Sequence, residues 1–174
     1  MPAKGPELYK KYETGGLRPD GKPGFDTPSG KVEAVSMILE KHGYPGLCEY
    51  KEPIEATPEF PLMLISGNRV PYIAHSKWRE DSPWLFELQE DPILTIHPED
   101  AANAGVREGV DAILKTAYGQ IRVKAKPTIL VPVGMVGIMH GWAKANVNDL
   151  IPREFDPISG FPAYKEVICR VERA

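Results

Sequence analysis

Three segments of the sequence combine glycine, a cationic or amide side chain, and an aromatic ring or histidine. They span residues 66–79, 139–148 and 156–165. Each lies beside an apolar run that predicts a strand, so the polar groups are expected at strand ends. Loops in such places carry binding groups on a rigid scaffold. Together these segments form a candidate site for a phosphorylated ring compound.

The first segment offers groups for a phosphate and for the edge of a ring. Gly67 would let a phosphate approach the backbone closely, and Arg69 or Arg79 offers planar donors that match its oxygens. His75 and Ser76 could donate to a ring system beside it. The alternative interpretation is a surface loop with solvated arginines, whose aromatic residues pack on the fold.

The second segment presents an imidazole, an indole and two amides, from His140, Trp142, Asn146 and Asn148. These groups suit the flat, polar-edged face of a purine or pterin. A helix-capping asparagine and a core tryptophan would explain the same residues.

The third segment contains a turn at residues 159–162, followed by Tyr164 and Lys165. The lysine could serve as a point charge for phosphate. By itself this pattern also fits an ordinary surface loop. Further basic residues alternate along residues 122–126, and we interpret them as the solvated outer face of a strand.

Several other kinds of site lack their sequence patterns here. There is no GxSxG, GxGxxG or GxxxxGK[ST] motif, and the four histidines lack the local spacing of a metal site. Cys48 and Cys169 can build neither a disulfide framework nor a CxxC-type cluster site. We interpret both as buried thiols that act as small apolar residues.

Composition narrows the class of protein. The 174 residues carry a net charge of -3 and are 42% hydrophobic, which predicts one ordinary soluble domain. The mild negative charge argues against nucleic acid as a partner. No stretch approaches the roughly 20 apolar residues that span a bilayer, so we expect no membrane insertion. With 18 prolines and 16 glycines, short segments are favoured over long helices.

The apolar patterns predict a fold that is mainly β with short helices. Strands are expected at residues 62–65, 93–97, 110–115, 121–126, 129–133 and 166–171, and helices at 31–42, 81–90, 98–104 and 142–150. The clearest element is the hairpin around Tyr118 and Gly119, where apolar and polar residues alternate on both sides of a turn. This pattern is typical of a small mixed barrel. Residues 1–30, with eleven prolines or glycines and few apolar side chains, are interpreted as a connector.

A series of short motifs follows this order along residues 25–172. They are FDTPSGKVE at 25–33, YKEP at 50–53, FPL at 60–62, SGNR at 66–69 with HS at 75–76, IHPEDA at 96–101 with GVREG at 105–109, GW at 141–142 with NVNDL at 146–150, and DPISG at 156–160 with Pro162, Tyr164 and Lys165. In this order they resemble the C-terminal domain of the molybdopterin oxidoreductases, the dimethyl-sulfoxide-reductase superfamily. Two motifs depart from that family: Asn68 separates glycine from arginine, and Val110 replaces an acid.

The resemblance implies a double-psi β-barrel (aspartate-decarboxylase-like) over residues 25–174, preceded by a linker over residues 1–24. It also implies that loops at one barrel end cover molybdopterin guanine dinucleotide, with molybdenum or tungsten. On this basis Ser66, Gly67 and Arg69 would approach a phosphate or the pterin, and Asn148 would read polar ring atoms. The full set of expected cofactor-binding residues is Ser66, Gly67, Asn68, Arg69, His75, Ser76, Arg79, Trp142, Asn146, Asn148, Phe161, Tyr164 and Lys165.

The same resemblance implies a function within a larger enzyme, similar to formate dehydrogenase or to polysulfide and thiosulfate reductases. Upstream catalytic domains of the same polypeptide would be the partners, with electron-transfer subunits beyond them. Metal ligands and any iron-sulfur cluster would lie in those domains, so we expect no turnover by this chain alone. Two alternatives stay open: a free-standing cofactor-binding subunit of a molybdenum or tungsten formyl-dehydrogenase complex, and a psi-barrel protein-interaction module without cofactor. The substrate and the compartment stay open as well.

Overall fold

The computed structural model describes residues 10–68, 72 and 78–174, which divide into two compact units. The first unit covers residues 1–52 and the second covers residues 53–174. The sequence placed the boundary between connector and domain at residue 25, whereas the contacts divide the chain after Glu52. The motif at residues 25–33 therefore belongs to the first unit.

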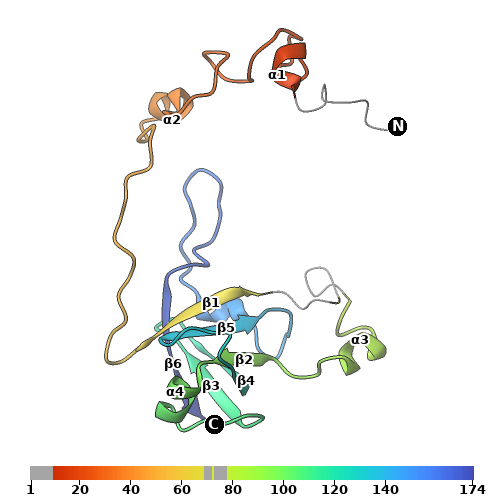
Figure 1. The fold of residues 1–174 in the computed structure, drawn as a ribbon, viewed down its shortest axis with the longest axis vertical. Helices are drawn as coiled ribbons and strands as arrows, with labels where there is room; N and C mark the ends of the chain where they lie inside the picture. Colours follow the sequence, from red (N-terminus) through yellow and green to blue (C-terminus); the bar gives the residue numbers. More distant parts are fainter. Residues whose placement is uncertain (1–9, 69–71, 73–77) are drawn as a thin grey trace. The chain divides into compact units, whose positions relative to one another are not determined.

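The second unit is a closed six-stranded barrel (Figure 1). Its strands are β1 (Leu62–Asn68), β2 (Ile93–Ile96), β3 (Asp111–Lys115), β4 (Gln120–Pro127), β5 (Met135–Met139) and β6 (Val167–Arg173). Around the barrel they follow the order β1-β5-β2-β4-β3-β6. Only β3 and β4 are neighbours both in sequence and in space, and they form the predicted hairpin.

Two pairs of barrel strands are parallel, β1 with β5 and β2 with β4, and the remaining neighbours are antiparallel. Each parallel pair needs a long crossover, since its strands run in the same direction. The chain between β1 and β2 and the chain between β4 and β5 supply the passages from one pair to the other. This mixed, closed arrangement is the expected double-psi β-barrel.

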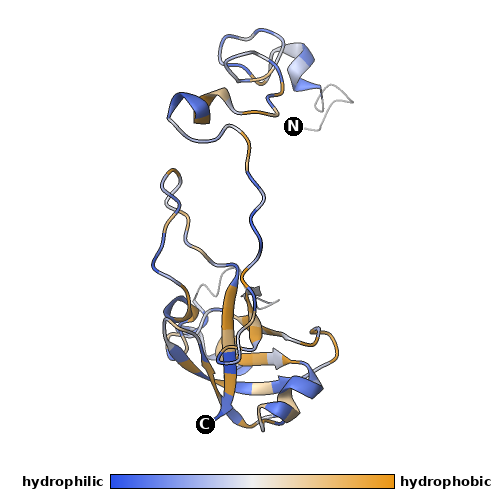
Figure 2. Ribbon diagram, turned by 90° about the vertical axis from the view of Figure 1, so that its left-hand side faces the viewer, coloured by the Kyte–Doolittle hydropathy of each residue, from blue (hydrophilic) through white to orange (hydrophobic). Residues whose placement is uncertain are grey.

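The barrel interior forms the apolar core, and the alternation of burial along each strand shows why. In β3, Ala112 and Leu114 are fully buried while their neighbours face outward. The same period of two runs along β4, where Ile121, Val123 and Ala125 point inward. Figure 2 shows hydrophobic positions, in orange, along the strands of the barrel. The alternation predicted for the hairpin is confirmed.

Short helices connect the strands. They are α3 (Pro83–Glu87), α4 (Pro98–Asn103) and the 3-10 helix η3 (Val147–Leu150). Proline occupies the first turn of α3 and α4, where its missing N–H costs nothing. His97 caps α4 by accepting a hydrogen bond from the N–H of Glu99 at 3.3 Å. All three lie within helical segments expected from the sequence.

The strand predicted at residues 129–133 was wrong. That segment is a turn in which Ile129 and Leu130 are 82% and 88% exposed, and the strand that follows it, β5, was not among the predicted strands. Pro132 has no N–H to give to a ladder, whereas β5 pairs with both β1 and β2. The prediction of two buried thiols was half wrong: Cys169 is buried, but Cys48 is exposed.

The first unit holds the helices α1 (Lys11–Thr14) and α2 (Met37–Lys41), joined by turns. Tyr12 and Phe25 stack with ring centroids 5.6 Å apart. Arg18 donates to Asp20 and holds the pKa of that carboxyl at about 2. Of the helix predicted over residues 31–42, the structure forms only the part that is α2.

Candidate functional site

The topology of the barrel places three chain segments at one rim. Strands β1 and β5 are parallel neighbours, so their C-terminal ends meet at the same end of the barrel. Strand β6 runs antiparallel to β1, so its first residues lie at that end too. The segments that follow β1, follow β5 and precede β6 are the three polar segments singled out from the sequence.

A cleft of about 1130 Å³ opens where these segments meet, and we call it the rim cleft. Its lining comes from all three segments: Ser66, Gly67, His140, Gly141, Trp142, Ala143, Asn146, Val147, Asn148, Phe161, Pro162, Ala163, Tyr164, Lys165 and Glu166. The walls combine aromatic rings, amides and a lysine with backbone at two glycines. The alternative interpretation, a protein-interaction module without cofactor, would be supported by loops on separate faces of the barrel. The described parts of these loops instead line one cleft.

Hydrogen bonds tie the segments together across the cleft. The hydroxyl of Ser66 donates to the carbonyl oxygen of Tyr164 at 3.1 Å, which joins the first segment to the third. The hydroxyl of Tyr164 donates to Oδ1 of Asn148 at 3.3 Å, which joins the third to the second. Oδ1 of Asn146 accepts from the N–H of Asn148 at 3.1 Å and caps η3. Among the described residues, Nδ2 of Asn148 has no hydrogen-bond partner.

The third segment supplies exposed aromatic and charged groups of the rim cleft. Phe161 is 64% exposed and meets Tyr164 edge to face, with centroids 5.8 Å apart. Lys165 is exposed beside them. Glu166, the last lining residue before β6, has a φ of 61°, in the left-handed region that costs a residue with a side chain. Strained backbone of this kind is common at functional sites.

An Asx turn orders the segment that carries these groups. Oδ1 of Asp156 accepts hydrogen bonds from the N–H and hydroxyl of Ser159, at 2.6 and 2.9 Å, and from the N–H of Ile158 at 3.0 Å. The two bonds from Ser159, followed by that from Ile158, hold the pKa of Asp156 below its usual value. A bridge between Phe155 and Pro162 closes the segment, which extends from the barrel as a long loop (Figure 1).

Arg79 lies behind the wall of the rim cleft and is absent from its lining. Its side chain is fully buried, and its guanidinium donates to the carbonyl oxygens of Gly141 and Gln89. Trp142 is buried as well, with its ring against that guanidinium, while part of it borders the cleft. The structure therefore gives Arg79 no direct place in the cleft.

Three of the expected residues, Arg69, His75 and Ser76, lie outside the described part of the chain. Asn68 is the last residue of β1. The sequence had not singled out Ala143, Val147, Pro162, Ala163 or Glu166 as binding groups. Alanine, valine and proline carry no chemical signal, and only the neighbouring Lys165 could have drawn attention to Glu166.

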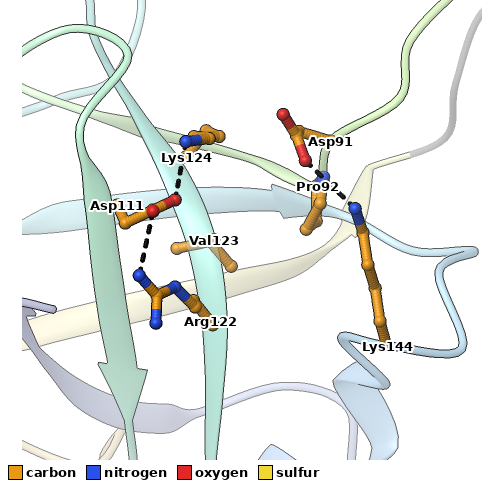
Figure 3. Close-up of a pocket in the computed structure, with 7 residues that line it drawn as sticks. All are labelled: Asp91, Pro92, Asp111, Arg122, Val123, Lys124 and Lys144. Atoms are coloured by element: carbon orange, nitrogen blue, oxygen red, sulfur yellow. Dashed lines mark hydrogen bonds and ion pairs between the residues drawn. The ribbon is translucent and has the colours of Figure 1, made fainter.

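A second, smaller hollow of about 390 Å³ lies on the outer side of the barrel, and Figure 3 shows its residues. Asp111 binds Lys124 at 2.8 Å and Arg122 at 2.9 Å, while Lys144 binds Asp91 at 3.0 Å. The hydrogen bond from Lys124, followed by that from Arg122, lowers the pKa of Asp111. Because each cation already pairs with a carboxylate, this hollow is the weaker candidate for an anionic ligand.

The described ranges contain neither a cluster of candidate metal ligands nor a helix that could span a membrane. No three His, Cys, Asp or Glu side chains among residues 10–68, 72 and 78–174 come together as a metal site would require. Within the same ranges no helix has the length and apolar character needed to cross a bilayer.

Comparison with known proteins shows the family. Residues 62–168 match the family described as "Molydopterin dinucleotide binding domain". Dopamine dehydroxylase of Eggerthella lenta is 30% identical, over 81% of this chain and 16% of that protein. Acetylene hydratase of Syntrophotalea acetylenica is 33% identical, over 68% of this chain and 17% of that protein. The chain thus spans about a sixth of the length of these relatives.

A solved structure supports the same fold. Acetylene hydratase from Pelobacter acetylenicus superposes with a TM-score of 0.78 at 24% sequence identity, over 91% of this chain and 25% of that one. The chain belongs to the molybdopterin dinucleotide-binding domain family of the dimethyl-sulfoxide-reductase superfamily. The cofactor of this family is molybdopterin guanine dinucleotide with molybdenum or tungsten.

Proposed function

We propose that the rim cleft binds one side of the molybdopterin guanine dinucleotide cofactor in a larger oxidoreductase. One observation carries this proposal: segments separated by up to about a hundred residues meet in a single cleft whose groups suit a phosphorylated ring compound. A ring can lie against aromatic side chains, and its polar edge can meet amides. Phosphates need cations and close backbone N–H groups.

The described residues divide these tasks by chemistry. Asn148 offers an amide for ring atoms, and Phe161 and Tyr164 offer ring faces and a hydroxyl. Lys165 supplies a positive charge, and Gly67 leaves open space above the backbone of β1. The cofactor itself would supply the redox chemistry of the enzyme. The work of this chain is to bind it, to fix its orientation and to exclude water from one side.

The rest of the enzyme belongs to the proposal too. The cleft is open, and a dinucleotide needs a second wall that further domains of the same polypeptide would provide. Partial enclosure predicts weak binding by this chain alone, because association costs stay the same while contacts are lost. Those other domains would determine the electron-transfer partners and the substrate. Formate, polysulfide, thiosulfate and nitrate are the candidate substrates.

The test is cofactor content in the protein expressed from its complete gene, in a host that makes the cofactor. Molybdenum or tungsten and acid-released GMP are measured for wild type, Asn148→Ala and Lys165→Ala. We expect each variant to lose cofactor about tenfold, since each removes a hydrogen bond or ion pair to a charged or polar ligand. Lys126→Ala is the matched control, because this exposed lysine lies outside the rim cleft. Full cofactor content in both cleft variants would refute the assignment.

A further inference from the structure

The wall of the rim cleft at Gly141, Trp142 and Ala143 is held from behind by a buried arginine. Arg79 is 0% exposed, which is rare for arginine and requires that its N–H groups find partners. Nε and Nη2 both donate to the carbonyl oxygen of Gly141, at 3.1 and 3.0 Å. Nη1 donates to the carbonyl oxygen of Gln89 at 3.2 Å. The planar fork therefore joins two backbone segments.

The tryptophan of this wall rests on the same guanidinium. Cζ of Arg79 lies 4.1 Å from the ring centroid of Trp142, within the range of a cation–π interaction. The indole Nε1 of Trp142 donates to the carbonyl oxygen of Glu90 at 3.1 Å. Because its face and its polar edge are both occupied, the ring has one orientation at the edge of the cleft.

The residue after the tryptophan is held by the neighbour of the arginine. Oε1 of Glu80 accepts a hydrogen bond from the N–H of Ala143 at 2.8 Å, and it lies 3.5 Å from Nη2 of Arg79. Gly141 has a φ of 120°, which glycine adopts without the strain that a side chain would cause, so this turn requires a glycine. Three consecutive wall residues are thus fixed by residues 79–90, which do not line the cleft.

We propose that Arg79 and Glu80 are positioning residues for the cofactor, which act through the wall of residues 141–143. This inference rests on the proposed function of the rim cleft. Arg79 sets the position of the Gly141 carbonyl and of the Trp142 ring, and Glu80 sets the N–H of Ala143. A lysine at position 79 keeps the charge but has no planar fork, so it cannot reproduce both bonds to one carbonyl oxygen.

Glu80 provides a test that leaves the fold intact. Its side chain is 45% exposed, so Glu80→Ala should keep the melting temperature of wild type. Glu80→Gln retains an oxygen acceptor for the N–H of Ala143, and it is the conservative rescue. We expect Glu80→Ala and Arg79→Lys to lower the cofactor content of the complete gene product about tenfold, and Glu80→Gln to restore it.

A second readout needs no cofactor. In the 174-residue chain, the indole N–H of Trp142 is followed by NMR hydrogen exchange. We expect Arg79→Lys to accelerate its exchange at least tenfold, because the ring loses its support. The matched control is Lys144→Ala, since Lys144 is exposed beside the same loop and bonds only to Asp91 among the contacts of the described chain.

The outcomes separate the two proposals. Loss of cofactor in Asn148→Ala and Lys165→Ala but full content in Glu80→Ala and Arg79→Lys would overturn the positioning role and leave the cleft assignment intact. Full content in all four variants would overturn the cleft assignment and this inference with it. Unchanged indole exchange in Arg79→Lys would also overturn the positioning role, whatever the cofactor content.

Discussion

Two glycines of the barrel should respond in opposite ways to alanine. Gly119 lies in the turn between β3 and β4, and a Cβ there would stand 2.4 Å from the carbonyl oxygen of Asp149. Gly67 lies in β1 at the rim cleft, and a Cβ there would meet nothing within 4 Å. The first substitution tests the packing of the fold, and the second tests the site.

The magnitudes follow from these distances. A Cβ contact under 3.0 Å forces something to shift, and at Gly119 the obstacle is backbone that belongs to η3. Overpacking of this kind costs about 1–3 kcal/mol. For a chain of this size that lowers Tm by roughly 2–12 °C. Gly67→Ala introduces no clash, so its stability should stay within about 0.5 kcal/mol of wild type.

The site should show the reverse pattern for Gly67. The added methyl group occupies the space through which a phosphate would approach the backbone, so the complete gene product should lose cofactor about tenfold. Gly119→Ala should lose cofactor only as far as the displacement of η3 moves Asn148.

The assays are thermal unfolding of the 174-residue chain by circular dichroism and cofactor content of the complete gene product. Wild-type stability in Gly119→Ala would refute the close packing of the hairpin turn against η3. Full cofactor content in a stably folded Gly67→Ala would refute the close approach of ligand to β1.

Three further predictions concern single groups. Burial raises the pKa of Cys169 to about 12, so at pH 8 a thiol reagent should modify only the exposed Cys48 in the native chain, and both thiols after denaturation. Glu166→Gly should stabilise the barrel by about 1 kcal/mol, measured by urea unfolding, because it removes a left-handed residue with a side chain. The pKa of Asp111 is lower in the folded state, so its stabilising effect should be complete above the ordinary carboxyl pKa and lost as pH falls through the lowered folded-state pKa. The difference in urea midpoint between wild type and Asp111→Asn should therefore disappear in acid, and a constant difference would contradict the assignment.

Local patterns allowed much of this fold to be predicted, and long-range pairing decided the rest. The hairpin of β3 and β4 follows from alternation that is complete within residues 110–126. The place of β5 does not, because residues 129–133 are as apolar as the true strand. What distinguishes Met135–Met139 is that β1 and β2 flank it on both sides, and those partners lie about 40 to 70 residues away in sequence.

The same difference between local patterns and long-range contacts decides which site residues could be predicted. Glycine with an amide or a cationic side chain marks each polar segment separately, and these local patterns already placed Asn148 and Lys165 among the expected site residues, which both line the rim cleft. The burial of Arg79 could not, because its acceptor is the carbonyl oxygen of a residue 62 positions away. In the sequence, an arginine near a glycine-rich loop looks like a phosphate-binding residue. Only the packing shows whether its side chain lies in the cleft or holds the wall of the cleft from behind.

The candidate site depends on the strand order of the closed barrel. The three segments share a rim only because β5 lies beside β1 in parallel and β6 lies beside β1 in the opposite direction. Loss of either pairing would separate the segments without altering a single lining residue. Substitutions that weaken the pairing of Leu64 with Val136, both almost fully buried, should therefore reduce cofactor content together with stability. By contrast, those at Asn148 or Lys165 should reduce cofactor content alone, so the ratio of the two effects separates barrel residues from ligand residues.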